Sequence, residues 1–380
     1  MSAVEDRLRD AYRAVADTID PATIPSVAVP TPSRAALSRR MRFVAPVAAA
    51  AAVTLVVTMT TLAVGAAPRD HVRAVTPRSH ARTVQTQPAA AASLPKFTLV
   101  DLGPSVKVYV TRTGVAVATL TPPAGQQFQD VASGGTARTY LAATGLSGPA
   151  CHAYFYRFEL SATGQPSPLT FLRSAPDSQP TAIAATRGGG TDAYSTVHCN
   201  TALPNGGVSI SGQAGNRTWT YPEADDYTFS LAATAHGHTL ALSLYVASGY
   251  ADMLLNTRSA ATTVVGASRV LASVPASETL AISPDGGTLY ACAAHGSTGT
   301  LTAYSTATGA PIRVLHQWPG YYQGFICQIS ADPTGRYLLA AVTADVSQPS
   351  TLTGFDLHTG AHATLRIHPH LPFRGAQLAW

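Results

Sequence analysis

Four cysteines are the residues of this chain whose chemistry is most readily predicted. They are Cys151, Cys199, Cys292 and Cys327. An even set of cysteines in an exported domain predicts disulfides. The dipeptides Cys151-His152 and His198-Cys199 also place thiol and imidazole ligands side by side, which leaves zinc as an alternative. Because neighbouring strand residues point to opposite faces, both members would converge on a metal only where the backbone turns, so we favour disulfides.

Two histidine pairs have the alternating spacing that directs both rings to one side of a strand. These are His236 with His238 and His368 with His370. Neither pair has a nearby carboxylate to orient the imidazoles, so solvated histidines are the simpler interpretation. The sequence contains no hydrolase elbow, zinc-protease helix or phosphate-binding glycine loop. We therefore expect no metal, no cofactor and no recognisable catalytic residue.

Aromatic residues in predicted loops are the strongest candidates for binding. Trp318, Tyr321 and Tyr322 lie in one connection, and Trp219 and Tyr221 lie in another. Rigid rings on loops are favoured in binding sites. The alternative is that these rings pack against the ends of the sheets. We predict a binding face formed by these five residues, for a protein or a small molecule that the sequence does not identify.

These residues lie among strands that repeat along the chain. An apolar run, a turn rich in Ser, Pro, Asp and Gly, a second apolar run and a Thr-Gly hairpin occur twice near the C-terminus. Corresponding positions (Ser283 and Ser330, Thr308 and Thr359) lie 47 to 51 residues apart. This period is typical of β-propeller blades. Looser copies begin near Phe97, so residues 96–380 divide into six blades of about 47 residues, and the period also allows seven.

Ring closure and the cysteine pairing follow from this division. The first blade has three predicted strands, and one strand, at 377–380, remains at the C-terminus. Adding that strand to the first blade closes the ring and hides the sheet edges. Blade adjacency then predicts the disulfides Cys151–Cys199 and Cys292–Cys327, each stabilising the fold by about 3–4 kcal/mol.

Residues 43–66 are uncharged, mostly apolar and long enough to form a transmembrane helix. A cleaved signal is the alternative, because Arg39-Arg40 precedes this stretch, but a leader of 42 residues is long for a signal. The arginine cluster and the exported cysteines favour a cytoplasmic N-terminus and a propeller outside the cell membrane. Residues 1–42 form the predicted tail, in which 2–19 is a short amphipathic helix that could dock a cytoplasmic partner. Residues 67–95 form a flexible linker.

The blade sequences resemble those of known propellers. The turn Ser283-Pro284-Asp285-Gly286, followed by Leu289-Tyr290-Ala291, is similar to blades of WD-repeat-like and TolB-type propellers. A short tail, one anchor and a propeller together resemble actinobacterial single-pass membrane proteins with such domains. No blade combines the Gly-His and Trp-Asp dipeptides of true WD repeats. The resemblance is strongest over residues 276–368, and it implies an architecture and binding rather than a reaction.

Charge and composition narrow the class of function further. Hydrophobic residues make up 46% of the chain and charged residues 12%, which suits short strands around a real core. The net charge of +5 arises outside residues 96–380, where fourteen basic and fourteen acidic residues cancel. A nucleic-acid-binding domain needs a basic surface, so we exclude one. We expect a membrane-anchored binding, sensing or protein-interaction module; the alternative is a propeller lyase or hydrolase acting on glycan or peptide at the channel mouth.

Overall fold

A computed structural model describes most of the chain beyond residue 93. The described residues are 94–146, 151–199, 206–213, 215–223, 226–246, 249–275, 277, 279–295, 298–319, 326–343, 349–369 and 378–380. The predicted tail helix, the predicted membrane span 43–66 and almost all of the predicted linker lie outside them. Among the described residues, no helix has the length and apolar character needed to cross a membrane.

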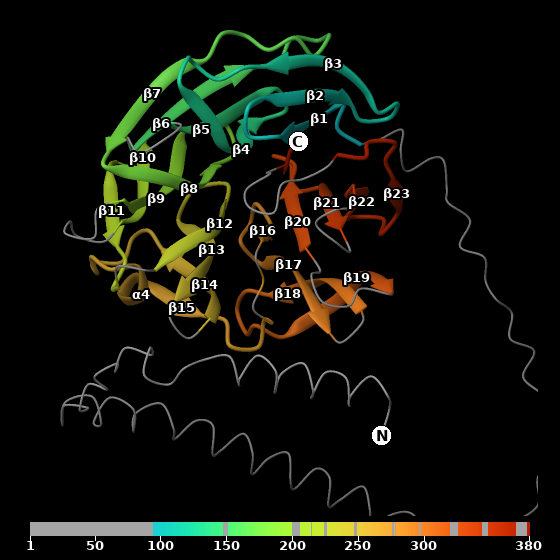
Figure 1. Cartoon of the computed structure of the whole chain (residues 1–380). Helices are drawn as coiled ribbons and strands as arrows, with labels where there is room; N and C mark the ends of the chain where they lie inside the picture. Colours follow the sequence, from blue (N-terminus) through green and yellow to red (C-terminus); the bar gives the residue numbers. More distant parts are fainter. Residues whose placement is uncertain are drawn as a thin grey trace, which may run out of the picture. The chain divides into compact units, whose positions relative to one another are not determined.

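The described strands form six antiparallel sheets of four strands each, arranged as the blades of a propeller (Figure 1). Blade 1 contains β24 (Leu378–Ala379), β1 (Phe97–Asp101), β2 (Val106–Val110) and β3 (Val115–Leu120). Blade 2 contains β4 (Gln126–Thr136), β5 (Thr139–Leu146), β6 (His152–Glu159) and β7 (Thr170–Pro176). Blade 3 contains β8 (Ser178–Ala185), β9 (Thr191–His198), β10 (Gly207–Gly212) and β11 (Arg217–Thr220).

The remaining blades follow the same order from the centre outward. Blade 4 contains β12 (Tyr227–Ala233), β13 (Thr239–Val246), β14 (Gly249–Asn256) and β15 (Ser268–Val270), with the short helix α4 (Val264–Ala267) before its last strand. Blade 5 contains β16 (Leu280–Ile282), β17 (Thr288–His295), β18 (Thr298–Ser305) and β19 (Pro311–Pro319). Blade 6 contains β20 (Ile326–Ala331), β21 (Tyr337–Thr343), β22 (Thr351–Asp356) and β23 (His362–Thr364). The prediction of six blades is confirmed.

The C-terminal strand closes the ring, as predicted. β24 pairs with β1 in antiparallel register, with Leu99 opposite Ala379 and Val100 opposite Leu378. The innermost strands β24, β4, β8, β12, β16 and β20 contact one another in turn around the ring. Trp380 is fully buried beside β1. A chain that ended before β24 would therefore leave the inner edge of β1 unpaired.

Four blades share one turn between their first two strands. Its first residue is Thr186, Thr234, Ser283 or Asp332. In each, a side-chain oxygen of that residue accepts a hydrogen bond from the backbone N–H five positions later, and a glycine with positive φ stands at the fourth position. Ser283 in blade 5 therefore corresponds to Asp332 in blade 6. The predicted correspondence between Ser283 and Ser330 was wrong by two residues. The repeated feature is an oxygen acceptor rather than one residue type.

The turns of neighbouring blades lie against each other. A Cβ at Gly286 would lie 3.0 Å from Cγ2 of Thr234 in the preceding blade, and a Cβ at Gly335 would overlap Cδ of Pro284. The backbone N–H of Ala235 also donates to the carbonyl oxygen of Pro284 at 2.8 Å. Glycine is required here because a side chain would collide with the adjacent turn.

Apolar side chains fill the space between adjacent blades. In β13, Leu240, Leu242 and Leu244 pack toward blade 3 with Trp219. The alternate residue Ala241 packs toward blade 5, and the Ser243 hydroxyl donates to the carbonyl oxygen of Ser277, just before that blade. This alternation follows the two-residue period of a strand. Each blade thus has two buried faces, and side chains reach solvent mainly at strand ends and on outer strands.

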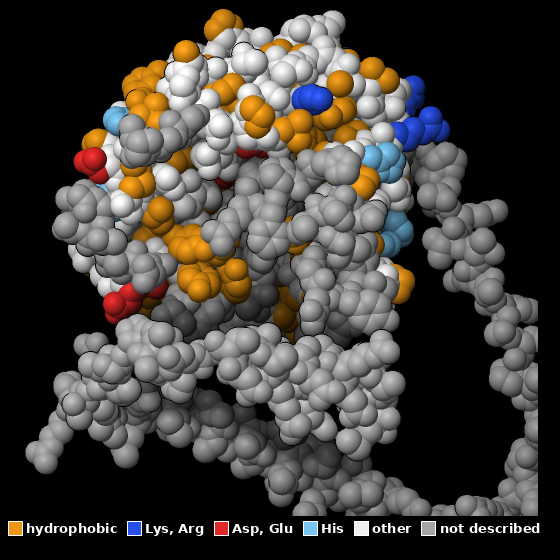
Figure 2. Space-filling view, viewed as in Figure 1, with side chains coloured by type: hydrophobic (Ala, Val, Ile, Leu, Met, Phe, Trp, Pro, Cys, Tyr) orange, Lys and Arg blue, Asp and Glu red, His pale blue; other side chains and the backbone are white. Residues whose placement is uncertain are grey.

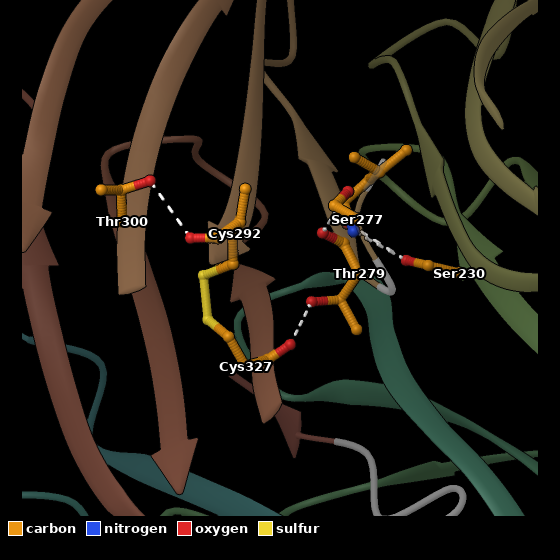
Figure 3. The surroundings of a disulfide bond; sticks show 8 residues. Ser230, Ser277, Thr279, Cys292, Thr300 and Cys327 are labelled. Atoms are coloured by element: carbon orange, nitrogen blue, oxygen red, sulfur yellow. Dashed lines mark hydrogen bonds between the residues drawn. A yellow bond between two sulfur atoms is a disulfide. The ribbon is translucent and has the colours of Figure 1, made fainter. Parts of the chain in front are cut away.

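Both predicted disulfides are present, and each joins adjacent blades. Cys151 and Cys199 link blades 2 and 3 with a Cα–Cα distance of 6.2 Å. Cys292 on β17 and Cys327 on β20 link blades 5 and 6 with a Cα–Cα distance of 6.0 Å (Figure 3). Beside the second bridge, the Thr279 hydroxyl donates to the carbonyl oxygen of Cys327 at 2.7 Å (Figure 3). The connection into blade 5 is thereby tied to the inner strand of blade 6.

Candidate functional site

The innermost strands surround a narrow central channel. Residues of β4, β8, β12, β16, β20 and β24 line it, and most of them are Ala, Ile, Leu and Ser. The cavity inside is about 110 Å³, below the 300–1,000 Å³ of typical small-molecule pockets. A ligand of ordinary size would therefore meet this protein at the mouth of the channel or between blades.

Asp130 is a buried carboxylate on the channel wall. Its Oδ2 accepts a hydrogen bond from the backbone N–H of Ile183 at 2.7 Å, which joins blade 2 to blade 3. Burial raises the pKa of Asp130 well above its usual value, and the neighbouring charge of Asp101 raises it further. Burial likewise raises the pKa of Asp101 to about 7. The hydrogen bond to Ile183 gives Asp130 a structural role at this interface.

Four aromatic rings form a continuous group on blade 4 at one end of the channel. Tyr227, Tyr245 and Tyr250 lie directly opposite one another on β12, β13 and β14, with successive ring centroids 5.1 Å and 5.4 Å apart. Phe229 contacts Tyr227 and Tyr250 at 4.6 Å and 5.2 Å and also lines the channel. We call these four residues the tyrosine ladder. It extends from the channel outward across the blade.

The tyrosine ladder is accessible to solvent. Tyr250 is 36% exposed, and the other three rings are half-buried. Figure 2 shows hydrophobic side chains gathered over β12, β13 and β14 on the viewed face. The ladder lies at the end of the channel opposite the glycine turns, because Phe229 near the start of β12 and Ala235 after its end line opposite ends of the channel wall. Solvent-accessible tyrosines whose rings contact one another are well suited to binding a partner.

A network of polar side chains lies between blades 4 and 5, on the strands β12 and β14 that also carry the tyrosine ladder. The Ser277 hydroxyl donates to Oδ2 of Asp252 at 3.0 Å. Burial raises the pKa of Asp252 to about 7. The Ser230 hydroxyl accepts a hydrogen bond from the backbone N–H of Leu280 at 2.9 Å (Figure 3). These contacts fix the position of blade 4, which carries the ladder, relative to blade 5.

Three of the five residues predicted for the binding face are described, and their rings are buried. Trp219 is fully buried between blades 3 and 4. The Tyr221 hydroxyl contacts Ser195 at 2.5 Å and donates to Thr228 at 2.8 Å. Trp318 packs against His316 with ring centroids 4.7 Å apart. Tyr321 and Tyr322 lie outside the described residues, so a binding role for the segment that begins at Trp318 stays a prediction.

The metal alternative can be examined for the cysteines and for His236 with His238, whereas His370 lies outside the described residues. All four cysteines are in disulfides, so no thiolate is left for zinc. The rings of His236 and His238 lie 6.0 Å apart, and His238 Nε2 contacts the Arg258 guanidinium at 2.6 Å. Among the described residues, no group of three His, Cys, Asp or Glu side chains could hold a metal ion.

Comparisons with known proteins support the fold. No protein-family model matches the sequence, and no curated protein matches it. A chain of a nidogen/laminin complex superposes with a TM-score of 0.51 at 12% identity, covering 74% of this chain and 97% of that one. A TolB structure from Acinetobacter baumannii has a TM-score of 0.49 at 12% identity, covering 75% and 66% of the two chains. At 12% identity, the likeness to the nidogen/laminin chain shows a shared fold alone.

Proposed function

We propose that this protein is a membrane-anchored, extracytoplasmic binding module that recognises a partner protein through the tyrosine ladder. The observation that carries the proposal is the mutual contact of Tyr227, Tyr245, Tyr250 and Phe229 at a solvent-accessible channel mouth. Tyrosine is enriched at protein interfaces because its ring buries a large area while its hydroxyl can form a hydrogen bond. A channel cavity of about 110 Å³ leaves a surface partner as the occupant that fits.

Two features support the extracytoplasmic location. Both disulfides join neighbouring blades, and bridges of this kind persist in oxidising compartments outside the cytoplasm. The uncharged stretch 43–66 has the length of a membrane span, and it precedes the propeller in the chain. Together they favour a propeller that is exported and held at the membrane.

The channel wall favours binding over the alternative of a propeller enzyme. Asp130 receives the Ile183 N–H, and Asp332 receives the N–H groups of Tyr337 and Thr334 within its own turn. Both carboxylates therefore have structural partners. Propeller chemistry on glycans or peptides would need an acid or base directed toward a substrate.

Position-specific cross-linking tests the binding surface. The full chain, in its native membrane, carries the photoreactive residue p-benzoylphenylalanine either at Tyr250 or at Ile312, which is 56% exposed on β19. We expect a discrete cross-linked protein from position 250, and a lower yield when Tyr245→Ala is added. The proposal is contradicted if position 312 gives the same product in equal yield, or if position 250 gives none.

Thiol labelling tests the location separately. A cysteine placed at Ile312 should react with a membrane-impermeant maleimide in intact cells, whereas one placed at Ser2 should react only after lysis. Labelling of Ser2→Cys but not Ile312→Cys in intact cells would reverse the proposed topology. Because this readout does not involve a partner, it can fail independently of the cross-linking result.

A further inference from the structure

A second cavity lies between blades 2 and 3, away from the tyrosine ladder. It has a volume of about 330 Å³, within the lower range of small-molecule pockets. Strands β5, β6 and β7 form one wall, and strands β8, β9 and β10 form the other. Figure 1 shows these strands side by side on one part of the ring. We call this cavity the inter-blade cleft.

An ion pair joins the two walls of the inter-blade cleft, because Arg157 lies on β6 and Asp192 lies on β9. Nη2 of Arg157 lies 2.9 Å and 3.0 Å from the two carboxylate oxygens of Asp192 and also contacts the carbonyl oxygen of Gly189 at 3.3 Å. Burial raises the pKa of Asp192, while the charge of Arg157 opposes that rise. The carboxylate of Asp192 is therefore committed to Arg157.

A second guanidinium, that of Arg173, has no carboxylate of its own among the described residues. Its Nη2 donates to the Ser211 hydroxyl at 3.2 Å, and its guanidinium carbon lies 4.5 Å from the ring centroid of Tyr194. Burial lowers the pKa of Arg173, whereas the nearby charge of Asp192 opposes that change. An arginine has five N–H donors, so most donors of Arg173 are left for a ligand.

The rest of the lining combines apolar and aromatic side chains with glycines and the polar side chain of Gln213. Phe155 packs against Tyr194 with ring centroids 4.8 Å apart, and Leu141 and Leu172 also line the cleft. The cleft thus places one positive, partly buried, planar group beside a surface that would accept a ring or an alkyl body. Arginine recognises planar carboxylates through two parallel hydrogen bonds.

We propose that the inter-blade cleft binds a small monoanionic carboxylate with an aromatic or apolar body, its carboxylate on Arg173 and its body against Tyr194 and Leu172. The charges of Arg157, Arg173 and Asp192 sum to +1, which matches a monoanion. A doubly charged phosphate would leave one negative charge without a cation, close to the carboxylate of Asp192. None of the four residues of the tyrosine ladder lines this cleft, so each proposal can be contradicted without affecting the other.

Titration with phenylacetate and its neutral isostere phenylacetamide tests this proposal on the full-length protein, by calorimetry or ligand-observed NMR. We expect saturable binding of phenylacetate, at least about tenfold tighter than that of phenylacetamide, because only the carboxylate can accept two charge-assisted hydrogen bonds. Arg173→Gln should weaken phenylacetate binding by about tenfold and leave the amide unaffected. Inorganic phosphate should bind more weakly than phenylacetate.

The matched control is Arg269→Gln. Arg269 is an arginine on an outer strand whose guanidinium donates to the carbonyl oxygens of Thr306 and Ala307, and its replacement should leave both affinities unchanged. Thermal melting of each variant separates loss of the site from loss of the fold. The proposal is overturned if phenylacetate shows no saturable binding up to about 10 mM, if the amide or phosphate binds equally well, or if a folded Arg173→Gln protein binds phenylacetate as before.

Discussion

The indole Nε1 of Trp380 donates a hydrogen bond of 2.6 Å to the hydroxyl of Thr98, a residue 282 positions earlier in the chain. Thr98 in turn contacts the Thr111 hydroxyl at 2.9 Å. All three side chains are buried. Trp380 is thereby connected to β1 and to the residue that follows β2, in addition to the backbone pairing of β24 with β1.

Replacing Trp380 should therefore open the ring. Trp380→Ala removes a fully buried indole, and we expect the free energy of unfolding to fall by about 3–5 kcal/mol. Trp380→Phe keeps most of the apolar area but loses the hydrogen bond to Thr98, and it should cost about 1–2 kcal/mol. Urea unfolding monitored by circular dichroism measures both. Equal, small effects of the two variants would show that the indole does not seal the ring.

Gly335→Ala should destabilise the protein more than Gly360→Ala. Both glycines have positive φ, +70° and +73°, so both variants carry the same backbone strain of about 1–2 kcal/mol. A Cβ at Gly335 would also overlap Pro284 of the preceding blade, whereas nothing lies within 4 Å of a Cβ at Gly360. We expect the collision to add about 1–3 kcal/mol. Indistinguishable melting temperatures would mean that the turns of blades 5 and 6 are not in close contact.

The two disulfides should differ in their accessibility to reductant. Cys199 is exposed, whereas Cys292 and Cys327 are each only 5% exposed. Under native conditions, a mild thiol followed by alkylation should label Cys151 and Cys199 first, as read by peptide mass spectrometry. The Cys292 and Cys327 peptides should be labelled only when the protein unfolds. The reverse order would contradict the burial of the second bridge.

Asp252 should make stability fall as the pH rises. Because burial raises its pKa to about 7 from an ordinary 3.8, the folded protein holds a proton that the unfolded chain has lost between these values. The contribution of Asp252 to the free energy of unfolding is therefore greatest below about pH 4 and is lost as the pH rises through about 7. Asp252→Asn has no titrating carboxyl at this position and should lack this loss. The free energy of unfolding of the variant, minus that of the wild type, should therefore increase by about 2–4 kcal/mol from pH 4 to pH 8.

The comparison of the two proteins isolates this one carboxyl, since Asp101 and Asp130 are unchanged in both. Denaturant unfolding at a series of pH values provides the measurement. A difference in free energy that stays constant across this range would indicate that Asp252 has an ordinary pKa in the folded protein.

The ring and its disulfides could be predicted because their signals are local in the sequence. Turn residues and the repeat length define the blades, and blade adjacency then pairs Cys151 with Cys199 and Cys292 with Cys327. The shared turn was harder to recognise, because its first residue is Thr, Ser or Asp and only the oxygen acceptor is constant. An oxygen-bearing residue followed three positions later by glycine is the pattern that would have found it.

The candidate sites depend on register, which the sequence did not reveal. Tyr227, Tyr245 and Tyr250 come together only because β12, β13 and β14 align them across the blade. Arg157 and Asp192 meet across two blades. Register also explains why the prediction for Trp219 differs from its position in the structure. On β11 the Trp219 ring is buried, whereas the neighbouring Thr218 and Thr220 are exposed. A position near a loop did not decide whether a ring packs or binds.

Closure of the ring is the central claim, because both the channel mouth and the blade order depend on the join between β24 and β1. Hydrogen exchange of the β1 amides, measured by mass spectrometry in the full chain and in a chain ending at Gln377, tests it directly. We predict slow exchange of residues 97–101 in the full chain, and exchange at least about tenfold faster in the shortened chain because the inner edge of β1 is then unpaired. Identical exchange of this segment in the two chains would contradict the account.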